Sequence, residues 1–239
     1  MIRVAIIPGA AQGIGEAIAY KLSSDGINVV LADLPHKNDA LKQVVDKIEG
    51  HGHKAIAITC DVSKESEVQE MVGKTVETFG RLDIMVANAG IASLCPILEL
   101  SDEQLDKLLG INLKGTLYCY RAAAVQMIKQ GQGGRIIGAS SIAEPKFGVR
   151  ALTQTAALEW GQHNITVNAY APGYINTPLV AESGGGSHGE NFLPLLSNSC
   201  LKRVGKPEEI AAVVSFLASE GASYVTGQAL GANGGYILS

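Results

Sequence analysis

Short, continuously apolar runs alternate with longer amphipathic stretches along almost the whole chain. The apolar runs predict β-strands at Val4–Ile7, Val29–Ala32, Ala55–Thr59, Ile84–Ala87, Arg135–Ala139, Thr166–Ala171 and Gln228–Gly231. The stretches between them predict helices at Glu16–Ser24, Asp39–Glu49, Glu65–Phe79, Asp102–Lys129, Ala151–Gln162 and Glu208–Leu217. Apolar runs without polar alternation are typical of parallel strands covered on both faces. The pattern therefore predicts an α/β fold, a doubly wound parallel sheet of about seven strands between two layers of helices.

No linker, internal repeat or charge block divides this pattern, so we expect one domain over residues 1–239. Ser101 and Gln104 have the spacing of a helix capping box, and Pro207 suits the first turn of a helix. In a sheet of this kind, ligands bind at the carboxyl ends of the strands. The segments that follow the strands are therefore where we look for chemistry.

The segment after the first strand reads Pro8-Gly9-Ala10-Ala11-Gln12-Gly13-Ile14-Gly15 and leads into a predicted helix. Glycines allow a tight turn and let the backbone approach a pyrophosphate, whose charge is stabilised by free N–H groups and the helix dipole. The second strand ends at Asp33, where a carboxylate can accept hydrogen bonds from both ribose hydroxyls. A 2′-phosphate would meet a like charge there, so Asp33 favours NAD(H) over NADP(H). We therefore predict a three-layer αβα Rossmann fold that binds NAD(H).

Composition and charge narrow the range of partners. The chain has 239 residues, of which 46% are apolar and 5% aromatic, and a net charge of −4. Without a basic stripe we expect no nucleic-acid partner, and no apolar stretch reaches the roughly 18 residues of a membrane span. The four cysteines are far apart and form no C-x-x-C pair, which predicts free thiols and a cytoplasmic protein. The spacing of His51 and His53 is not that of metal ligands, so we expect no metal site.

Small and polar residues also follow the later strands. They are Asp61, Val62, Asn88, Ala89, Gly90, Asn112, Ser140, Ser141, Pro172, Gly173, Ile175 and Thr177. With these residues and the glycine loop, the chain resembles the short-chain dehydrogenase/reductase family from end to end. Residues 150–156 and the glycine-rich ending make it most similar to the NAD-dependent acetoin (diacetyl) and 2,3-butanediol dehydrogenases of that family.

The resemblance implies a cofactor role for most of these residues. The pyrophosphate and the adenosine ribose would be held by Gly9, Gln12, Gly13, Ile14 and Gly15. The adenine would be bordered by Asp61 and Val62, and the nicotinamide ribose by Asn88, Ala89 and Gly90. The nicotinamide carboxamide would be seated by Pro172, Gly173, Ile175 and Thr177. Pro8 stands where the family usually has Thr, and we expect this to change the packing of the loop only modestly.

The catalytic residues of the family, unlike its cofactor-binding residues, are not all present in this sequence. The family uses a Ser to polarise the carbonyl, a Tyr to transfer the proton, and a Lys four residues later to lower the pKa of that Tyr. Ser141 and Asn112, which would support a proton-relay water, are present, but no Tyr lies between Ser141 and Arg150. In one alignment Lys146 is the motif Lys and a block of about a dozen residues is missing before it. In the other, both Tyr and Lys are missing.

The predicted substrate lid, residues 178–201, is also shorter than is usual in the family and contains the flexible patch Ser183–Ser187. Both shortened segments border the substrate pocket, whereas the buried strands and helices are complete. We hypothesise that the native chain carries pocket residues that the printed sequence lacks. The alternative is a true loss during evolution. Tyr174 is a weak substitute for the motif Tyr, because no lysine lies beside it in the sequence.

The sequence thus predicts an NAD(H)-dependent oxidoreductase that acts on a small carbonyl or alcohol, such as a hydroxyketone or vicinal diol. One alternative is a catalytically inactive NAD(H)-binding protein, and another is a reductase of sugars, polyols or steroids. The resemblance also implies a homotetramer or homodimer built on the long helices and on the apolar ending Ala229–Leu238.

Overall fold

The strands of the computed structural model form a single parallel sheet in the order β3-β2-β1-β4-β5-β6-β7. The structure describes residues 2–93, 95–141, 147–181, 186 and 190–237. The strands are β1 (Val4–Pro8), β2 (Asn28–Asp33), β3 (Ala55–Thr59), β4 (Ile84–Ala87), β5 (Gly134–Ala139), β6 (Ile165–Pro172) and β7 (Ala229–Ala232). Each of them overlaps a predicted strand, and the predicted fold class is confirmed.

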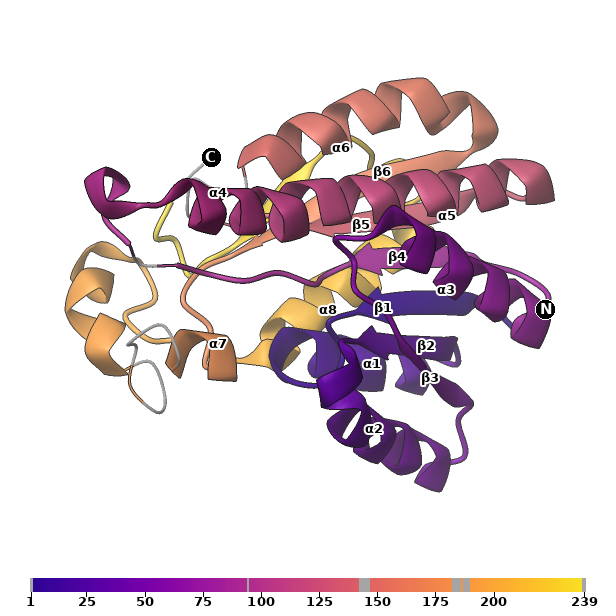
Figure 1. The fold of residues 1–239 in the computed structure, drawn as a ribbon, viewed down its shortest axis with the longest axis horizontal. Helices are drawn as coiled ribbons and strands as arrows, with labels where there is room; N and C mark the ends of the chain where they lie inside the picture. Colours follow the sequence, from indigo (N-terminus) through magenta and orange to yellow (C-terminus); the bar gives the residue numbers. More distant parts are fainter. Residues whose placement is uncertain (1, 94, 142–146, 182–185, 187–189, 238–239) are drawn as a thin grey trace.

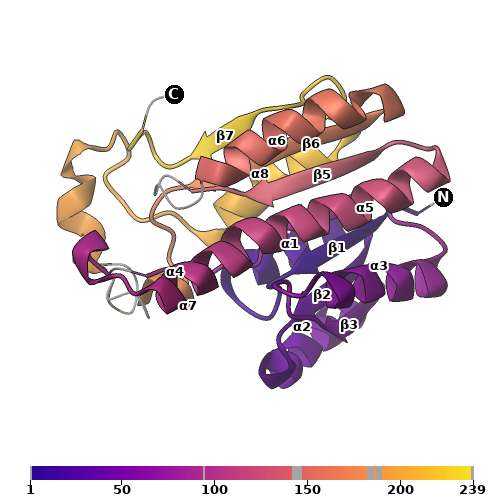
Figure 2. The ribbon, with the colours of Figure 1, turned by 45° about the horizontal axis from the view of Figure 1, so that its top comes forward.

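Helices cover both faces of this sheet. The longer ones are α1 (Gly13–Ser24), α2 (Asn38–Gly50), α3 (Glu65–Phe79), α4 (Asp102–Leu109), α5 (Thr116–Gln130), α6 (Phe147–Trp160) and α8 (Pro207–Ala218). Apolar residues of α1, α2 and α8 pack on one face, and those of α3, α5 and α6 on the other. Figures 1 and 2 show α1 and α8 on the side of the sheet opposite α5 and α6. Two hydrophobic cores therefore flank the strands, as continuous apolar runs require.

Several shorter turns connect these elements. They include the 3₁₀ turns Pro35–Lys37, Ile97–Glu99, Gly161–His163, Glu190–Asn198 and Glu220–Ala222, and the single helical turn α7 (Pro178–Val180). The capping box at the start of α4 is confirmed, because the Gln104 N–H donates to Ser101 Oγ and the Ser101 N–H donates to Gln104 Oε1. Pro207 begins α8, as predicted.

The segment predicted as a long helix, Asp102–Lys129, is helical throughout, but it contains a π-helical turn that the sequence did not predict. A π-helical turn, Gly110–Gly115, separates α4 from α5. At this turn the Asn112 side chain leaves the helix and pairs with the backbone of Ile91, accepting from its N–H and donating to its carbonyl oxygen, both at 2.9 Å. Single π-turns inside helices often occur at functional sites. The extra residue of this turn aims Asn112 at the segment that follows β4.

Candidate functional site

The glycine loop joins β1 to α1 at the carboxyl edge of the sheet. Gly9 and Gly13 have φ angles of +76° and +63°, which favour glycine. A Cβ atom on Gly15 would lie 2.1 Å from the carbonyl oxygen of Gly9, so no larger residue fits without moving the loop. The N–H groups of Gly9 and Ala10 both donate to the carbonyl oxygen of Ala32, at 2.7 and 3.1 Å. This glycine-dependent cradle at a helix start fits the pyrophosphate of a dinucleotide.

The Asn88 side chain fastens this loop to the centre of the sheet. Its Nδ2 donates to the carbonyl oxygens of Pro8 and Gly9, at 3.0 and 3.1 Å. Its Oδ1 accepts a hydrogen bond of 2.8 Å from the hydroxyl of Tyr170 on β6. The side chain therefore positions the loop, a contribution that the sequence analysis did not assign to it. Ala89 lies directly against the loop, since a Cβ on Gly9 would come within 2.9 Å of Ala89 Cα.

Asp33 ends β2 beside the loop, as the sequence predicted. Its Oδ2 accepts the Ala11 N–H at 3.1 Å, and its Oδ1 accepts the Leu34 N–H at 2.8 Å. A carboxylate offers about four lone-pair positions, so each oxygen can accept one further hydrogen bond. Nearby, the ammonium group of Lys37 donates to Gln12 Oε1 at 3.1 Å. Sequence reasoning missed this lysine, because its contact joins two turns that are 25 positions apart.

Asp61 and Val62 follow β3; the Asp61 side chain forms hydrogen bonds within its own turn, whereas the Val62 side chain is buried against the π-turn. Asp61 Oδ1 accepts both the N–H and the hydroxyl of Ser63, at 3.0 and 2.7 Å, so this oxygen stabilises the turn before α3. Val62 is buried and packs on the π-turn, because a Cβ on Gly115 would lie 2.9 Å from Val62 Cγ2. The second oxygen of Asp61 lies 3.8 Å from the Lys64 ammonium group.

The residues predicted for the nicotinamide end follow β6. Thr177 comes close to the glycine loop, since a Cβ on Gly13 would lie 3.4 Å from Thr177 Cγ2. Ile175 is buried and bridges to Gly205, and Gly173 packs against Asn233 at the end of β7. The fold thus brings the first loop and the segment after β6 together at the same edge of the sheet.

The structure describes two of the three predicted catalytic residues, Asn112 and Ser141. Asn112 is buried, its side chain pairs with the backbone of Ile91, and its main-chain carbonyl oxygen accepts the Thr116 hydroxyl at 2.9 Å. Ser141 is half-buried and follows β5. Lys146 lies outside the described residues, and so do parts of the predicted lid. Gly90, which was predicted to border the nicotinamide ribose, follows Ala89 in the segment after β4.

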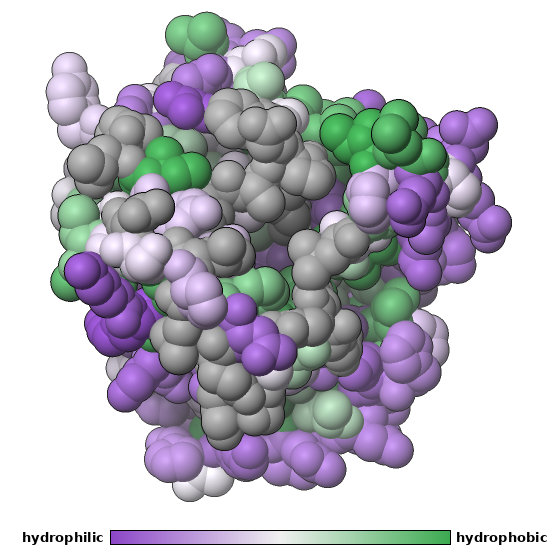
Figure 3. All heavy atoms as spheres, turned by 90° about the vertical axis from the view of Figure 1, so that its left-hand side faces the viewer, coloured by the Kyte–Doolittle hydropathy of each residue, from purple (hydrophilic) through white to green (hydrophobic). Residues whose placement is uncertain are grey.

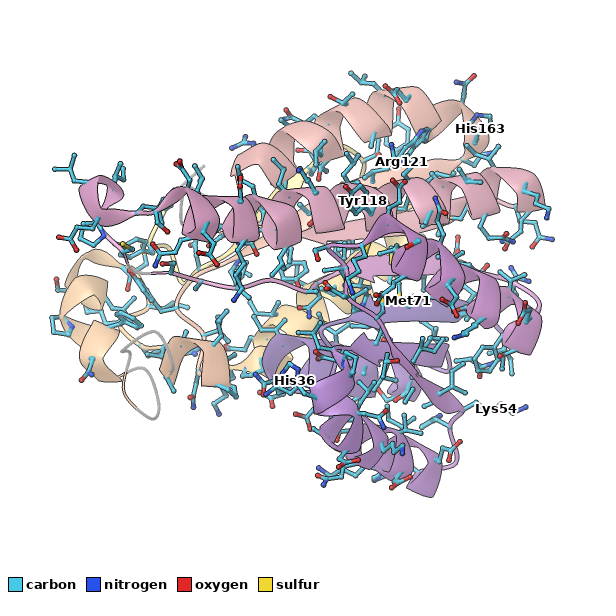
Figure 4. All side chains as sticks on the ribbon, viewed as in Figure 1. His36, Lys54, Met71, Tyr118, Arg121 and His163 are labelled. Atoms are coloured by element: carbon cyan, nitrogen blue, oxygen red, sulfur yellow. The ribbon has the colours of Figure 1, made fainter. Side chains whose placement is uncertain are left out.

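Four of the described tyrosines have a pKa that is raised above its ordinary value. Burial raises the pKa of Tyr120, whose hydroxyl contacts Thr153 at 2.9 Å, and burial likewise raises the pKa of Tyr170. Burial and the neighbouring Tyr236 raise the pKa of Tyr174, which also stacks on another aromatic ring. Tyr118 lies on α5 with the Arg121 guanidinium 5.7 Å above its ring (Figure 4). Burial and the Glu16 carboxylate raise the pKa of Tyr20 to about 12. A base needs a lowered pKa, so none of these four shifted phenols suits that role.

A cavity of about 230 Å³ lies between the segment after β6 and the end of β7. Tyr174, Leu201 and the backbone of Gly231–Gly235 line it, together with Arg203, which forms two hydrogen bonds with Glu209 at 2.8 and 2.6 Å. The face of the molecule at the carboxyl ends of the strands is hollowed near its middle, and hydrophobic residues reach the rim of this hollow (Figure 3).

Among the described residues, no cluster of three or more His, Cys, Asp or Glu could hold a metal ion. Likewise, no helix in the described part of the chain is long and apolar enough to cross a membrane.

Comparison with known proteins covers almost the whole chain. The family model described as enoyl-(acyl carrier protein) reductase matches residues 9–237. A short-chain dehydrogenase/reductase of Armillaria gallica is 44% identical over 99% of this chain and 96% of its own length. A diacetyl reductase [(S)-acetoin forming] of Staphylococcus epidermidis is 42% identical over 99% of both chains. These two alignments extend over 251 and 258 positions, so each relative has positions that the 239-residue chain lacks.

Solved structures agree with the sequence relatives. A short-chain type dehydrogenase/reductase from Mycobacterium marinum has a TM-score of 0.91 and 34% identity, covering 99% of this chain and 96% of its own. An acetoin dehydrogenase from Salmonella typhimurium has a TM-score of 0.86 and 31% identity, with the same coverage. A gluconate 5-dehydrogenase from Beutenbergia cavernae, described as putative and NAD(P)-dependent and solved with NADP bound, has a TM-score of 0.90 and 30% identity over 99% and 97% of the two chains.

Proposed function

Because this chain belongs to the short-chain dehydrogenase/reductase family, we propose that it is an NAD(H)-dependent oxidoreductase acting on a small hydroxyketone or vicinal diol. The observation that carries the cofactor choice is the anchored carboxylate of Asp33, which keeps one acceptor position on each oxygen for a ribose hydroxyl. The substrate class is supported by the relatives described as diacetyl reductase, L-2,3-butanediol dehydrogenase and acetoin dehydrogenase.

Each part of the site then has a defined task. The bound nicotinamide would supply or accept the hydride. The loop from Gly9 to Gly15 holds the pyrophosphate, and Thr177, which lies beside this loop at Gly13, helps to seat the nicotinamide carboxamide. The Ser141 hydroxyl donates a hydrogen bond to the substrate oxygen, where one such donor contributes about 10²- to 10³-fold in kcat. Asn112 supports a water that relays the proton between solvent and the proton donor, toward the substrate in reduction and away from it in oxidation.

The proton donor is the part of the proposal that depends on the missing segment. No Tyr occurs between Tyr120 and Tyr170, and the relatives have positions that this chain lacks. We therefore retain the hypothesis that the native chain carries a Tyr-containing segment after Ser141, with Lys146 as the motif lysine. The alternative is a protein that binds NAD(H) without turnover.

The intact mass of the purified protein, with peptide mapping across residues 138–152, tests the proposed function first. A mass above 24.9 kDa by more than a kilodalton, with a Tyr-containing peptide in that window, is the result expected. NADH consumption with diacetyl and acetoin is then measured beside NADH binding. Ser141→Ala should lower kcat about 10²- to 10³-fold and leave NADH binding unchanged, whereas the matched surface variant Ser24→Ala should change neither. Binding without turnover over a broad ketone panel would establish the inactive alternative instead.

A reductase of sugars or polyols is the second candidate. It is favoured by a relative described as L-rhamnose 1-dehydrogenase (NAD(P)(+)), which is 34% identical over 99% of this chain, and by the gluconate 5-dehydrogenase structure. Including L-rhamnose and gluconate in the substrate panel separates the two candidates, because the preferred class has the higher kcat/KM.

We also propose that the protein assembles as a homotetramer or homodimer. Val125 on α5 and Leu158 on α6 expose 65% and 87% of their surface, and covering apolar side chains of this size favours association. Light scattering after gel filtration measures the oligomeric state directly.

We further propose a cytoplasmic location. The four cysteines are free thiols in the structure, which supports this proposal because disulfides are rare in reducing compartments.

A further inference from the structure

Tyr170 lies near the end of β6 and connects segments from different parts of the site. Only 1% of its surface is exposed, and its carbonyl oxygen accepts the Ser140 N–H at 2.8 Å. Ser140 precedes Ser141, the proposed donor to the substrate oxygen. The residue of β5 that pairs with Tyr170 is Ala139, and both side chains lie in the same hydrophobic core. The main chain of Tyr170 is thus fixed to the end of β5.

The hydroxyl of Tyr170 holds one end of the Asn88 side chain. It donates a hydrogen bond of 2.8 Å to Asn88 Oδ1. Burial raises the pKa of Tyr170, so the hydroxyl keeps its proton near neutral pH and remains a donor. The other end of the amide, Nδ2, donates to the carbonyl oxygens of Pro8 and Gly9, at 3.0 and 3.1 Å. One amide group is therefore held by β6 at one end and by the glycine loop at the other.

Holding both ends matters because the terminal torsion of an asparagine side chain has a broad energy minimum. An amide with partners at one end only can turn about this torsion, and such a turn disturbs its bonds to both loop carbonyls together. Nδ2 lies between two glycines, since Cβ atoms on Gly9 and Gly15 would come within 2.9 and 2.6 Å of it. A turn of the amide would therefore displace the loop and the start of α1.

The glycine loop is fastened on both sides. The N–H groups of Gly9 and Ala10 donate to the Ala32 carbonyl oxygen of β2, and the Asn88 amide holds the loop from the side of β4. A pyrophosphate at the first N–H groups of α1 requires these groups to be in place before binding, because ordering a loop on binding costs affinity. Loosening either side of the loop should therefore weaken cofactor binding.

We infer that Tyr170 is a positioning residue of the cofactor site: its hydroxyl holds the Asn88 amide, and the amide holds the glycine loop in the form that binds NADH. The inference rests on the cofactor site of the proposed function and adds to it a residue that acts through Asn88. The affinity for NADH then depends on a buried hydroxyl of β6, a strand that β4 and β5 separate from β1 in the sheet.

Tyr170→Phe removes the hydroxyl and keeps the ring, and fluorescence titration with NADH measures the effect on binding. The dissociation constant should rise about threefold to tenfold, the range expected for one lost hydrogen bond. Tyr120→Phe is the matched control, because Tyr120 is equally buried and its hydroxyl contacts Thr153 on α6. Both variants should lose a similar amount of thermal stability, but the control should bind NADH within about twofold of wild type.

Hydrogen exchange of the unliganded proteins, followed by mass spectrometry, gives a second measurement that needs no cofactor. Peptides containing residues 8–15 should exchange faster in Tyr170→Phe than in wild type, and at the wild-type rate in Tyr120→Phe. In a protein that already carries Asn88→Ala, adding Tyr170→Phe should change neither the NADH affinity nor the loop exchange further, because the hydroxyl acts through the amide.

The outcomes separate the inference from its premise. Wild-type NADH affinity in Tyr170→Phe, or an equal loss of affinity in Tyr120→Phe, would overturn the role of Tyr170 while leaving the cofactor site in place. A Tyr170→Phe protein that does not fold, beside a folded Tyr120→Phe, would overturn it as well, since the hydroxyl would then serve the fold as a whole. Wild type that binds no NADH would overturn the proposed cofactor site and the inference together.

Discussion

Replacing Gly15 with alanine tests whether the close packing of the glycine loop is needed for both stability and cofactor binding. The added Cβ would lie 2.1 Å from the carbonyl oxygen of Gly9 and 2.6 Å from Nδ2 of Asn88. An ordinary carbon–oxygen contact is about 3.3 Å or more, so the atoms must separate by roughly 1 Å. One of them belongs to the backbone of the loop, which cannot turn away as the end of a flexible side chain would.

The expected cost combines two effects of similar size. Forcing an extra carbon into a well-packed region costs about 1–3 kcal/mol. Displacing the Gly9 carbonyl also weakens its hydrogen bond with Asn88, a contribution of about 0.5–1.5 kcal/mol. The better helix propensity of alanine returns up to about 1 kcal/mol, because Gly15 lies in the first turn of α1. We therefore expect Gly15→Ala to lower the free energy of unfolding by about 2–3 kcal/mol.

Urea unfolding followed by circular dichroism measures this loss, and fluorescence titration with NADH measures binding. Gly73→Ala is the matched control, because this exposed glycine lies inside α3 and its Cβ would meet no atom within 4 Å. That variant should gain about 0.5–1 kcal/mol and bind NADH normally. A Gly15→Ala protein with wild-type stability and NADH affinity would refute the argument from close approach.

Three further predictions concern other contacts. Asn88→Ala should lower the free energy of unfolding by about 2–4 kcal/mol in calorimetry, because it leaves two loop carbonyls and one buried hydroxyl without their partner. Hydrogen bonds from Arg203 lower the pKa of Glu209 from 4.5 to about 2, so the pair stabilises the fold above pH 4.5 and this contribution is lost as pH falls through about 2. Glu209→Gln should accordingly cost up to about 1 kcal/mol in urea unfolding at pH 7 and progressively less toward pH 2, since the pair is exposed. Burial and nearby carboxylates raise the pKa of Cys60 to about 12, so at pH 8 peptide mapping should find iodoacetamide on the exposed Cys200 long before Cys60.

The strands could be predicted from the sequence because a parallel strand covered on both faces is apolar at nearly every position. Val4–Ile7 and Val29–Ala32 form strands that have a neighbour on each side, and both segments read as such runs; the structure extends them by one and two residues. The capping box at Ser101 could be predicted for a similar reason, since both partners are three positions apart. These signals are local, so one segment of the sequence contains all the information.

The π-turn and the anchoring of the loop could not be predicted in this way, because both depend on contacts between distant segments. Asn112 leaves the helix to pair with Ile91, 21 positions away, and the helical periodicity on either side is unaltered. Asn88 bonds to carbonyls 79 and 80 positions earlier. A polar residue two positions before a glycine, as Asn88 is before Gly90, reads equally well as a turn former or as a ligand, and only the folded arrangement of β1, β4 and β6 decides between them.

The two halves of the site have different physical requirements, and this separates binding from turnover. The cofactor half is built from β1, β2, β4 and β6, and Asn88, Asp33 and the glycines are fixed by hydrogen bonds or packing within that framework. The catalytic half needs a phenol beside a lysine, and the raised pKa values of the buried Tyr120 and Tyr170 and of the half-buried Tyr174 make these phenols unsuited to that task. NADH binding should therefore not depend on a phenol in the segment between β5 and α6, while turnover requires that segment to supply its own tyrosine.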